Sequence, residues 1–360
     1  MYVAIKLFNI INKQTRNAQK NKGVFTIINP TIVFEEKNKV VLVDTAMPEF
    51  GTDQMLIKTE GTQISIGTEL SILMRDNVES GSRWDIYGKF PFKAGYTNIG
   101  TVEAVGEGVD KSWLGKRVAS YGLHSKYNVF RPEKVYSVPE HAPTNKALFF
   151  GISEIAMNGV HRSGFKWGDS AVVYGAGVIG QLTAQYLSLA GAYPVFVADI
   201  SDNRLSKLPK RANIIPVNTA KEDIEEVITA KNHGRKADMV FELTGEAALI
   251  PGQVKLIRRM GKLIILSSPR GSTVFDFHDL CNLPNLKIIG IHNASHPAHP
   301  EEENQWTNAR DAEMFFSLLE NGSIEVEQLI THEVPYTEAL DTYRMLMENK
   351  TQALAIHLLW

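Results

Sequence analysis

Three glycines stand between a stretch of strand-forming residues and a stretch of helix-forming residues. Residues 171–174 (Ala-Val-Val-Tyr) lead into Gly175, Gly177 and Gly180 in the spacing G-x-G-x-x-G, and helix formers occupy 181–189. This order of strand, glycine turn and helix is typical of a site that binds the diphosphate of a dinucleotide. Gly175 makes the turn, Gly177 admits the phosphates close to the backbone, and Gly180 lets the helix pack on the strand.

The residues after this turn indicate which dinucleotide is bound. Val178 and Ile179 begin the helix, where free N–H groups and the positive end of the helix dipole would hold the phosphates. A second strand-forming stretch, 194–198, ends at Asp199, about 20 residues after the last glycine. An acidic side chain there accepts hydrogen bonds from both ribose hydroxyls and repels a 2′-phosphate, which favours NAD over NADP. Arg204 is near enough in the sequence to bind a 2′-phosphate, so NADP stays the alternative.

A histidine-rich segment follows the last predicted strand of the same parallel sheet. His292, His296 and His299 lie close together in it. Because such sheets bind ligands at the carboxyl ends of their strands, we expect this segment to bind substrate through His296, with His292 nearest the nicotinamide. A metal site is one alternative, although Pro297 and Pro300 preclude the helix that usually presents such ligands. A plain surface loop is the other.

Polar side chains also occur at other strand ends and on one helix. Thr244, Ser267 and Pro269 follow two further predicted strands and are expected to contact the cofactor.

Glu154 interrupts the apolar stripe of a helix predicted over 146–162. A buried glutamate there would have a raised pKa and would suit a general base that takes the proton of an alcohol.

Length and composition limit the class of protein. The chain has 360 residues, which is more than usually fold around one hydrophobic core, so two domains are expected. The net charge of −2 and the lack of a basic stripe with aromatic residues argue against nucleic acid as a partner. Cys281 is the only cysteine, which excludes an intramolecular disulfide and every cysteine-based zinc site and fits a reducing, cytoplasmic setting. No apolar run reaches the ~18 residues that span a bilayer, and residues 1–11 are predicted to be a short extension rather than a membrane contact.

The elements that must position these residues begin with a β-rich section. Short strands separated by turn residues run to about residue 145 and predict an antiparallel barrel or sandwich. The predicted strands are 24–28, 31–35, 40–44, 55–59, 63–66, 99–106, 117–121 and 127–130.

Helices and strands alternate in the section that follows. The predicted helices are 146–162, 181–189, 221–231 and 247–257, and the predicted strands are 171–174, 194–198, 214–217, 238–245, 261–267 and 286–291. Six strands with intervening helices predict a doubly wound parallel sheet.

The last section is too short to be a domain of its own. It is predicted to contain helices over 309–320 and 337–348 and strands over 329–334 and 353–359, and to return to the β-rich section. We therefore expect residues 1–148 and 306–360 to form a β-rich catalytic domain and residues 149–305 the dinucleotide domain, with the active site in the cleft between them.

With these elements the chain resembles the medium-chain dehydrogenase/reductase superfamily over nearly its full length. The matching phrases are 66–69 (Ile-Gly-Thr-Glu), 92–100, 102–109, 115–118 and 168–177. The resemblance implies an α/β fold with a doubly wound Rossmann sheet and a β-rich, GroES-like catalytic domain. It also implies a homodimer formed through the edge strand near 286–291.

The commonest members of this superfamily bind a catalytic zinc, and here the chain departs from their pattern. Ile66 stands where they have a cysteine, and Tyr96 and Thr97 replace a histidine and a glutamate. Their third ligand falls near Gly151. Because zinc prefers cysteine, histidine and carboxylate ligands, the resemblance is to a zinc-independent branch with no metal. Three phrases, 67–69, 95–97 and 154–158, are most similar to the branch named for bacteriochlorophyllide a dehydrogenase.

Without a metal, side chains must carry the charge change at the substrate oxygen. Tyr96 is expected to donate a proton or hold the substrate, unless it only fills the space left by the metal. Thr68 matches a hydroxyl residue that relays protons in the zinc enzymes, with a turn cap as the alternative. Glu69 and Asn98 are also expected at the substrate, Glu69 through a buried salt bridge behind it, and Arg75 would suit a hydroxylated ligand.

These expectations combine into a zinc-independent, NAD(H)-dependent oxidoreductase that interconverts a secondary alcohol and a ketone on a polar small molecule. One alternative is a reductase of activated double bonds, like the zinc-free quinone and enoyl reductases of the superfamily. Those relatives favour NADPH, so Asp199 argues against it. The alternative outside the enzymes is a dinucleotide-binding regulator without chemistry.

Overall fold

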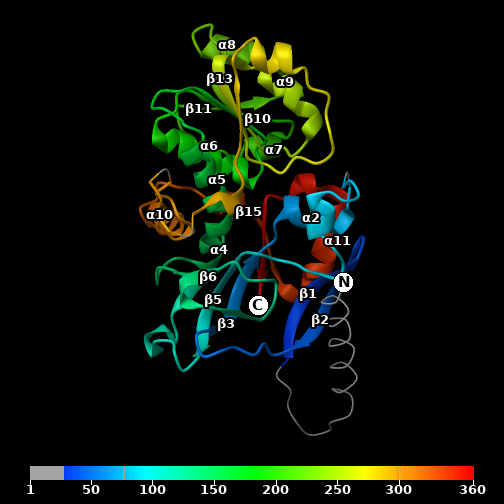
Figure 1. Cartoon of the computed structure of the whole chain (residues 1–360), viewed down its shortest axis with the longest axis vertical. Helices are drawn as coiled ribbons and strands as arrows, with labels where there is room; N and C mark the ends of the chain where they lie inside the picture. Colours follow the sequence, from blue (N-terminus) through cyan, green and yellow to red (C-terminus); the bar gives the residue numbers. More distant parts are fainter. Residues whose placement is uncertain (1–27, 77, 298, 303) are drawn as a thin grey trace.

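The computed structural model describes residues 28–76, 78–297, 299–302 and 304–360. The predicted N-terminal extension and most of the predicted strand 24–28 lie outside these residues. Two sheet-containing parts are visible, one drawn mainly in blue and cyan and one in green and yellow (Figure 1). No helix of the described residues is both long enough and apolar enough to cross a membrane.

Antiparallel pairing dominates the blue and cyan part, as the turn-rich sequence predicts. Its strands are β1 (Ile28–Glu36), β2 (Lys39–Ala46), β3 (Met55–Gln63), β4 (Phe92–Lys93), β5 (Asn98–Val105), β6 (Arg117–Ser120), β7 (Tyr127–Phe130), β8 (Val135–Ser137), β15 (Ile330–Pro335) and β16 (Ala355–Leu359). A three-stranded sheet has the order β2-β1-β4. A seven-stranded sheet has the order β15-β16-β3-β5-β6-β8, with β7 paired to β3.

The last strands of the chain thus belong to the sheet of the first section. Strand β16 is antiparallel to β3, with His357 opposite Gln63, and parallel to β15. Five helices accompany this part: α2 (Ile66–Met74), α3 (Arg83–Tyr87), α4 (Thr144–Ala147), α10 (Asn308–Glu320) and α11 (Ala339–Asn349). Helix α11 packs on α2 and β2.

The central section forms the expected doubly wound parallel sheet. Its strands are β9 (Ala171–Tyr174), β10 (Val195–Asp199), β11 (Ile214–Asn218), β12 (Ala237–Glu242), β13 (Ile257–Ile265) and β14 (Lys287–Gly290). Its helices are α5 (Phe150–Arg162), α6 (Val178–Ala190), α7 (Asp202–Leu205), α8 (Ile224–Lys231) and α9 (Ile250–Val254). The strand order is β11-β10-β9-β12-β13-β14, and every pairing is parallel.

Apolar residues cover both faces of this sheet, which is why its strands are continuous hydrophobic runs. Val172 and Val173 are neighbours on β9, yet they belong to two different hydrophobic clusters because successive side chains point to opposite faces. Both are fully buried.

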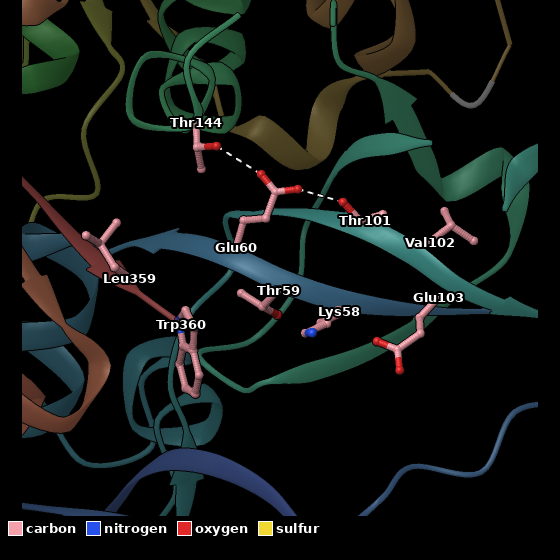
Figure 2. Close-up of a pocket in the computed structure, with 9 residues that line it drawn as sticks. All are labelled: Lys58, Thr59, Glu60, Thr101, Val102, Glu103, Thr144, Leu359 and Trp360. Atoms are coloured by element: carbon pink, nitrogen blue, oxygen red, sulfur yellow. Dashed lines mark hydrogen bonds between the residues drawn. The ribbon is translucent and has the colours of Figure 1, made fainter. Parts of the chain in front are cut away.

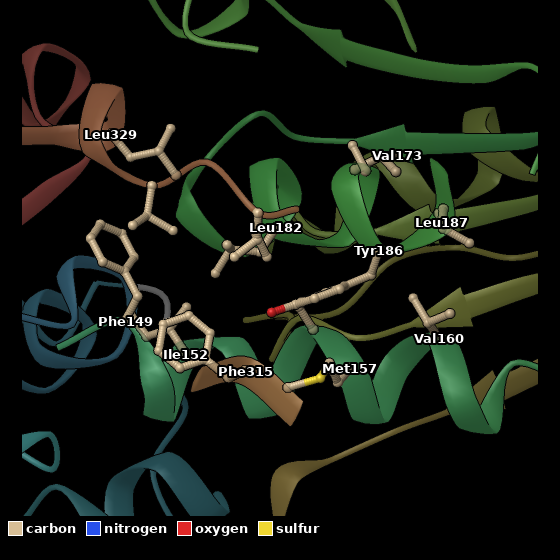
Figure 3. Packing of buried hydrophobic residues seen from close by; sticks show 14 of the residues in the cluster. Phe149, Ile152, Met157, Val160, Val173, Leu182, Tyr186, Leu187, Phe315 and Leu329 are labelled. Carbon is tan, nitrogen blue, oxygen red and sulfur yellow. The ribbon is translucent and has the colours of Figure 1, made fainter. Parts of the chain in front are cut away.

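One of these clusters continues beyond the sheet. Phe315 of α10 packs with Met157 of α5 and Tyr186 of α6, and Leu329 lies near Phe149 at the start of α5 (Figure 3). Helix α10 therefore packs on α5, although the strands that follow it join the other sheet.

Three element predictions were wrong in detail. Residues 63–66 are not a strand: β3 ends at Gln63 and α2 begins at Ile66, where the backbone N–H of Ser65 donates to Glu69 Oε1 at 2.9 Å and closes the first turn. The helix predicted over 146–162 is two helices, α4 and α5. The helix predicted over 247–257 is cut to α9 because β13 begins at Ile257.

Candidate active site

The glycine turn has the geometry that a diphosphate site requires. Gly175 has a φ of +114°, which residues with a side chain rarely adopt. A Cβ atom on Gly180 would lie 1.9 Å from the carbonyl oxygen of Gly175, so only glycine allows α6 to start this close to the turn. A Cβ atom on Gly177 would meet no atom of the described chain within 4 Å. Space is therefore open where the phosphates are expected.

The start of α6 is also electrostatically suited to an anion. Gly177 caps the helix, and Gly177, Val178 and Ile179 are all partly exposed. The first turn contains no acidic side chain to oppose a phosphate.

Asp199 ends β10 beside this turn. Its Oδ2 accepts a hydrogen bond from the backbone N–H of Ala176 at 2.8 Å, and its Oδ1 accepts one from Ser201 at 2.9 Å. Arg204 Nη1 lies 3.8 Å from Asp199 Oδ2, and Arg204 Nη2 donates to the carbonyl of Lys350 at 3.3 Å. The carboxylate thus supports the glycine turn and holds the nearby arginine.

Glu242, which the sequence reasoning missed, organises the end of β12. This buried carboxylate accepts hydrogen bonds from the backbone N–H groups of Thr244 at 2.7 Å and Gly245 at 3.1 Å, and from the hydroxyls of Thr244 and Ser267. The two hydroxyls expected at the cofactor are therefore turned toward Glu242. Pro269 is partly exposed just beyond them. An acidic residue closing an apolar strand was the signal in the sequence.

Arg270 connects the two parts of the molecule and was also missed. Its guanidinium donates to the hydroxyl of Ser71 on α2, and its Nη2 lies 3.3 Å from Glu246 Oε1. Since Ser71 is 199 positions away in the sequence, no local pattern predicts this contact.

Tyr96 is half-buried near the start of α2. Its hydroxyl lies 2.6 Å from Ser65 Oγ and also hydrogen-bonds with Thr68. Burial raises the pKa of Tyr96 to about 12. Tyr96 is therefore protonated at neutral pH, so its hydroxyl suits the role of a hydrogen-bond donor and not that of a base. The structure brings Tyr96 and Thr68 together.

Glu154 lies on α5 and is completely buried. Its Oε2 accepts a hydrogen bond from the hydroxyl of Tyr121 and one from Asn308 Nδ2 at 2.7 Å, whereas its Oε1 has no partner in the described structure. Burial raises the pKa of Glu154 to about 8, although the bonds from Tyr121 and Asn308 oppose this rise.

The three histidines after β14 do not converge. His296 points inward, and its Nε2 lies 2.8 Å from Asp311 Oδ2 on α10. Burial would lower the pKa of His296, but the hydrogen bond and the charge of Asp311 outweigh burial and raise it. His161 Nε2 lies 3.4 Å from the other oxygen of Asp311. His292 and His299 are exposed, so the metal alternative for this segment has no geometric support.

Glu69 is buried against His124, a pair that is a salt bridge only when the imidazole is protonated. Its carboxylate lies 3.2 Å from His124 Nε2 and accepts a hydrogen bond from Tyr343. Burial would raise the pKa of Glu69, but the charge and hydrogen bond of His124 reverse the effect and lower it. With these partners in the core, Glu69 does not face a substrate.

Asn98 and Arg75 both have partners within the chain. Asn98 is fully buried in the sheet, where its Nδ2 donates to Thr59 Oγ1 at 2.8 Å and its Oδ1 accepts from Ser120 at 3.3 Å. Its position at the start of a strand gave no sign of which way the amide points. Arg75 is paired with Asp85.

A separate hollow of about 750 Å³ lies on the seven-stranded sheet. Glu60 lies at its wall and accepts hydrogen bonds from Thr101 at 2.7 Å and Thr144 at 2.9 Å (Figure 2). Because Arg117 also contacts this carboxylate, at 3.3 Å, we interpret Glu60 as a structural group.

Comparison with known sequences gives distant relatives. Residues 178–309 match a family model described as zinc-binding dehydrogenase. An uncharacterised zinc-type alcohol dehydrogenase-like protein of Escherichia coli K12 is 23% identical over 71% of this chain and 78% of its own length. A putative D-xylulose reductase of Agrobacterium fabrum is 23% identical over 88% and 95%. The match to L-arabinitol 4-dehydrogenase of Aureobasidium melanogenum, at 25% identity, spans 57% of this chain and 53% of that protein.

Solved structures agree in fold. An alcohol dehydrogenase of Escherichia coli CFT073, complexed with NADH, superimposes with a TM-score of 0.74 over 92% of this chain and 99% of its own, at 20% identity. A putative zinc-binding dehydrogenase of Sinorhizobium meliloti 1021, bound to NADP, gives 0.76 over 93% and 100%, also at 20% identity. The chain is therefore similar in sequence to alcohol dehydrogenase-like oxidoreductases and shares the fold of their solved structures.

This dehydrogenase-like chain differs from a zinc enzyme in its side chains. Thr97 and Gly151 are neighbours, since a Cβ atom on Gly151 would lie 3.1 Å from Thr97 Oγ1. Together with Ile66 and Tyr96 they offer no thiolate, imidazole or carboxylate, so these positions do not fit a zinc ion. Among the described residues no three histidine, cysteine, aspartate or glutamate side chains are placed to share a metal ion.

Proposed function

We propose that this chain is a zinc-independent, NAD(H)-dependent oxidoreductase that interconverts a secondary alcohol and a ketone on a polar small molecule. The observation that carries the proposal is the buried carboxylate of Glu154. This carboxylate, with a pKa raised to about 8 by burial, stands one helical turn from Gly151. A pKa near the operating pH suits a general acid or base, and such a group must accompany hydride transfer to or from a carbon that bears oxygen.

The cofactor is a nicotinamide dinucleotide, since structural neighbours of this chain were solved with NADH and with NADP. When bound, it supplies the hydride acceptor or donor. The residues that would hold it are those of the glycine turn and Asp199. We favour NAD because Asp199 lies beside the turn, where it would meet the ribose. Arg204 is already engaged by Asp199 and by the carbonyl of Lys350.

Side chains take the place of zinc in this proposal. Support comes from the apolar or neutral residues at the positions that match the metal ligands, in particular Ile66 and Thr97. Tyr96 and Thr68 would hold the substrate oxygen as hydrogen-bond donors, and Glu154 would take or supply the proton.

The relatives favour polyols and sugars as the substrate class. Their names include L-arabinitol 4-dehydrogenase and putative D-xylulose reductase, activities on secondary alcohols of hydroxylated carbon chains. The amides of Asn293 and Asn308, both near Glu154, suit such a substrate because they donate and accept hydrogen bonds. We further propose a cytoplasmic homodimer with no nucleic-acid or membrane partner.

The test is a screen of purified protein against polyols, sugars and their ketones, following NADH absorbance. We expect turnover with at least one secondary alcohol and its ketone, and a lower dissociation constant for NAD than for NADP by calorimetry. Metal analysis should give much less than one zinc per chain. Stoichiometric zinc would contradict the metal-free assignment, and turnover of quinones or enones alone would favour the double-bond reductase. Cofactor binding without any turnover would favour the regulator.

A further inference from the structure

Tyr121 occupies the junction between the two parts of the molecule. It directly follows β6, and its ring borders Gly151 of α5, where a Cβ atom would lie 3.6 Å from Tyr121 Cε1. Thr97 borders the same position, with its Oγ1 3.1 Å from such a Cβ atom. Tyr121 therefore lies beside Thr97 and Gly151. These are two of the positions that match zinc ligands in the zinc enzymes but have no metal-binding side chain here.

The hydrogen-bond partners of the Tyr121 hydroxyl orient its O–H bond. Asn293 Nδ2 and Asn308 Nδ2 donate to the Tyr121 oxygen at 3.4 Å and 3.3 Å. The hydroxyl itself donates to Glu154 Oε2. Two amide donors on the oxygen and a carboxylate on the hydrogen polarise the O–H bond and would stabilise negative charge on the oxygen during proton transfer.

Glu154 and Tyr121 differ in their exposure to solvent. Glu154 is completely buried, whereas Tyr121 is only partly buried. Of the two groups, the tyrosine is therefore the more accessible to a substrate. Asn293 comes from the segment just after β14, at the carboxyl end of the Rossmann sheet, where such sheets bind ligands. Its contact at 3.4 Å is the longest of the three and is the one that a substrate hydroxyl would replace.

We propose that Tyr121 exchanges the proton with the substrate oxygen and that Glu154 receives it from Tyr121. The inference rests on the proposed function and names the group that touches substrate. In oxidation, the alcohol O–H bond breaks and its proton goes to Tyr121 Oη, while the proton of Tyr121 goes to Glu154 Oε2. The electron pair of the carbinol C–H bond leaves as hydride to NAD, which gives the ketone, NADH and protonated Glu154. Reduction runs the same transfers in reverse.

The surroundings of Glu154 agree with this role. Burial raises the pKa of Tyr121 well above its ordinary value, so the tyrosine carries its proton at rest. The titratable groups that face Glu154 are Tyr121 and Tyr136 from the β-rich part, and His296 and Asp311 from the segment after β14 and from α10. The charge of His296 favours the carboxylate and that of Asp311 opposes it.

The experiment compares Tyr121→Phe with Tyr136→Phe in the full-length protein with bound cofactor. Both tyrosines pack on the Phe150 ring, with centroid distances of 5.7 Å and 6.0 Å, but Tyr136 is not a hydrogen-bond partner of Glu154. The substrate pair is the polyol and ketone with the highest wild-type rates in the screen. Tyr121→Phe should lower kcat by about 10²–10⁴-fold with unchanged NADH affinity, and Tyr136→Phe should stay within about twofold. Rates are measured from pH 6 to 9.

Each outcome is decisive. A Tyr121→Phe enzyme with kcat within about twofold of wild type, while Glu154→Gln loses about 10²-fold, would overturn the role of Tyr121 and leave the proposed function intact. A wild-type protein that binds NADH but turns over no alcohol or ketone would overturn the proposed function and this inference with it. If Tyr121→Phe does not fold, Glu154→Asp withdraws the carboxylate from Tyr121 by one methylene and should lose at least about 10-fold in kcat. An unchanged kcat in that variant would also overturn the inference.

Discussion

At the residue scale, the glycine turn offers a matched pair of substitutions. Gly177→Ala adds a methyl group in open space, so the fold should keep its melting temperature while NADH affinity falls by about 10-fold, because the methyl group occupies the phosphate position. Gly180→Ala drives a Cβ atom into the Gly175 carbonyl and should cost at least about 2 kcal/mol of stability as well. Calorimetry with NADH and thermal unfolding measure the two effects. Equal loss of stability in both variants would contradict the assignment of Gly177 to the phosphates.

Glu154 should give the reaction a specific pH dependence. Oxidation needs the carboxylate, so its rate should rise as pH passes through about 8, whereas reduction needs the acid, so its rate should fall over the same range. Glu154→Gln should remove this transition in both directions. A wild-type profile that is flat from pH 6 to 9 in both directions would assign the proton transfer to another group.

Single residues were predictable where spacing or strand position defines their task. The glycine turn, the position of Asp199 beside it and the burial of Glu154 on α5 are of this kind, whereas their tasks toward cofactor and substrate stay predictions. Tyr121 and Arg270 were not predictable, because each acts through partners more than thirty residues away that only the folded chain brings near. The partners of Asn98 were not predictable for the same reason: its strand was correct, but the direction of its side chain depends on the sheet around it.

At the element scale, β16 holds a buried histidine whose protonation opposes folding. His357 is fully buried opposite Gln63 and against Phe149, and burial lowers its pKa to about 4. The unfolded chain binds this proton near pH 6.5, so stability should fall as pH drops from about 6.5 to 4, by roughly 3 kcal/mol at most. Urea unfolding of His357→Leu should show a smaller loss over this range than wild type. An identical loss would show that another group causes the acid sensitivity.

Elements in the parallel sheet were predicted more accurately than the segments that connect the two parts. The strand at 171–174 and the helix after Gly180 follow from continuous apolar runs and glycine punctuation, which are local signals. The Ile64–Ile66 stretch alternates like a strand but turns into α2. Ile64 still pairs with β16, its N–H donating to the carbonyl of Ile356 at 2.9 Å, and the chain then enters α2 at Ile66. That partner lies near the other end of the chain.

At the scale of the whole molecule, β14 is one of the two edge strands of the Rossmann sheet. Ile288 on this strand is 38% exposed, and Leu283 and Phe277 of the segment before the strand are 55% and 68% exposed. We expect a second copy to cover this edge. Ile288→Asp should shift the protein from dimer to monomer in analytical ultracentrifugation, whereas Leu189→Asp, at the end of α6 and 44% exposed in the wild type, should not. A wild-type monomer at micromolar concentration would contradict the dimer.

The two-part architecture was predictable from the change between strand-only and alternating patterns. The position of α10 was not, because an amphipathic helix does not reveal which of two available surfaces it will cover. The sequence places it with the tail, and packing places it on α5.

The pairing of β16 with β3 has a consequence for the order in which the molecule is made. All six Rossmann strands are synthesised by residue 290, well before the last section, so that sheet can begin to fold during translation. The seven-stranded sheet must wait for residues 355–359, and until then one edge of β3 lacks the partner that it has in the finished protein. We expect nascent chains to expose that edge to chaperones, and slow translation of the last section to lengthen the exposure.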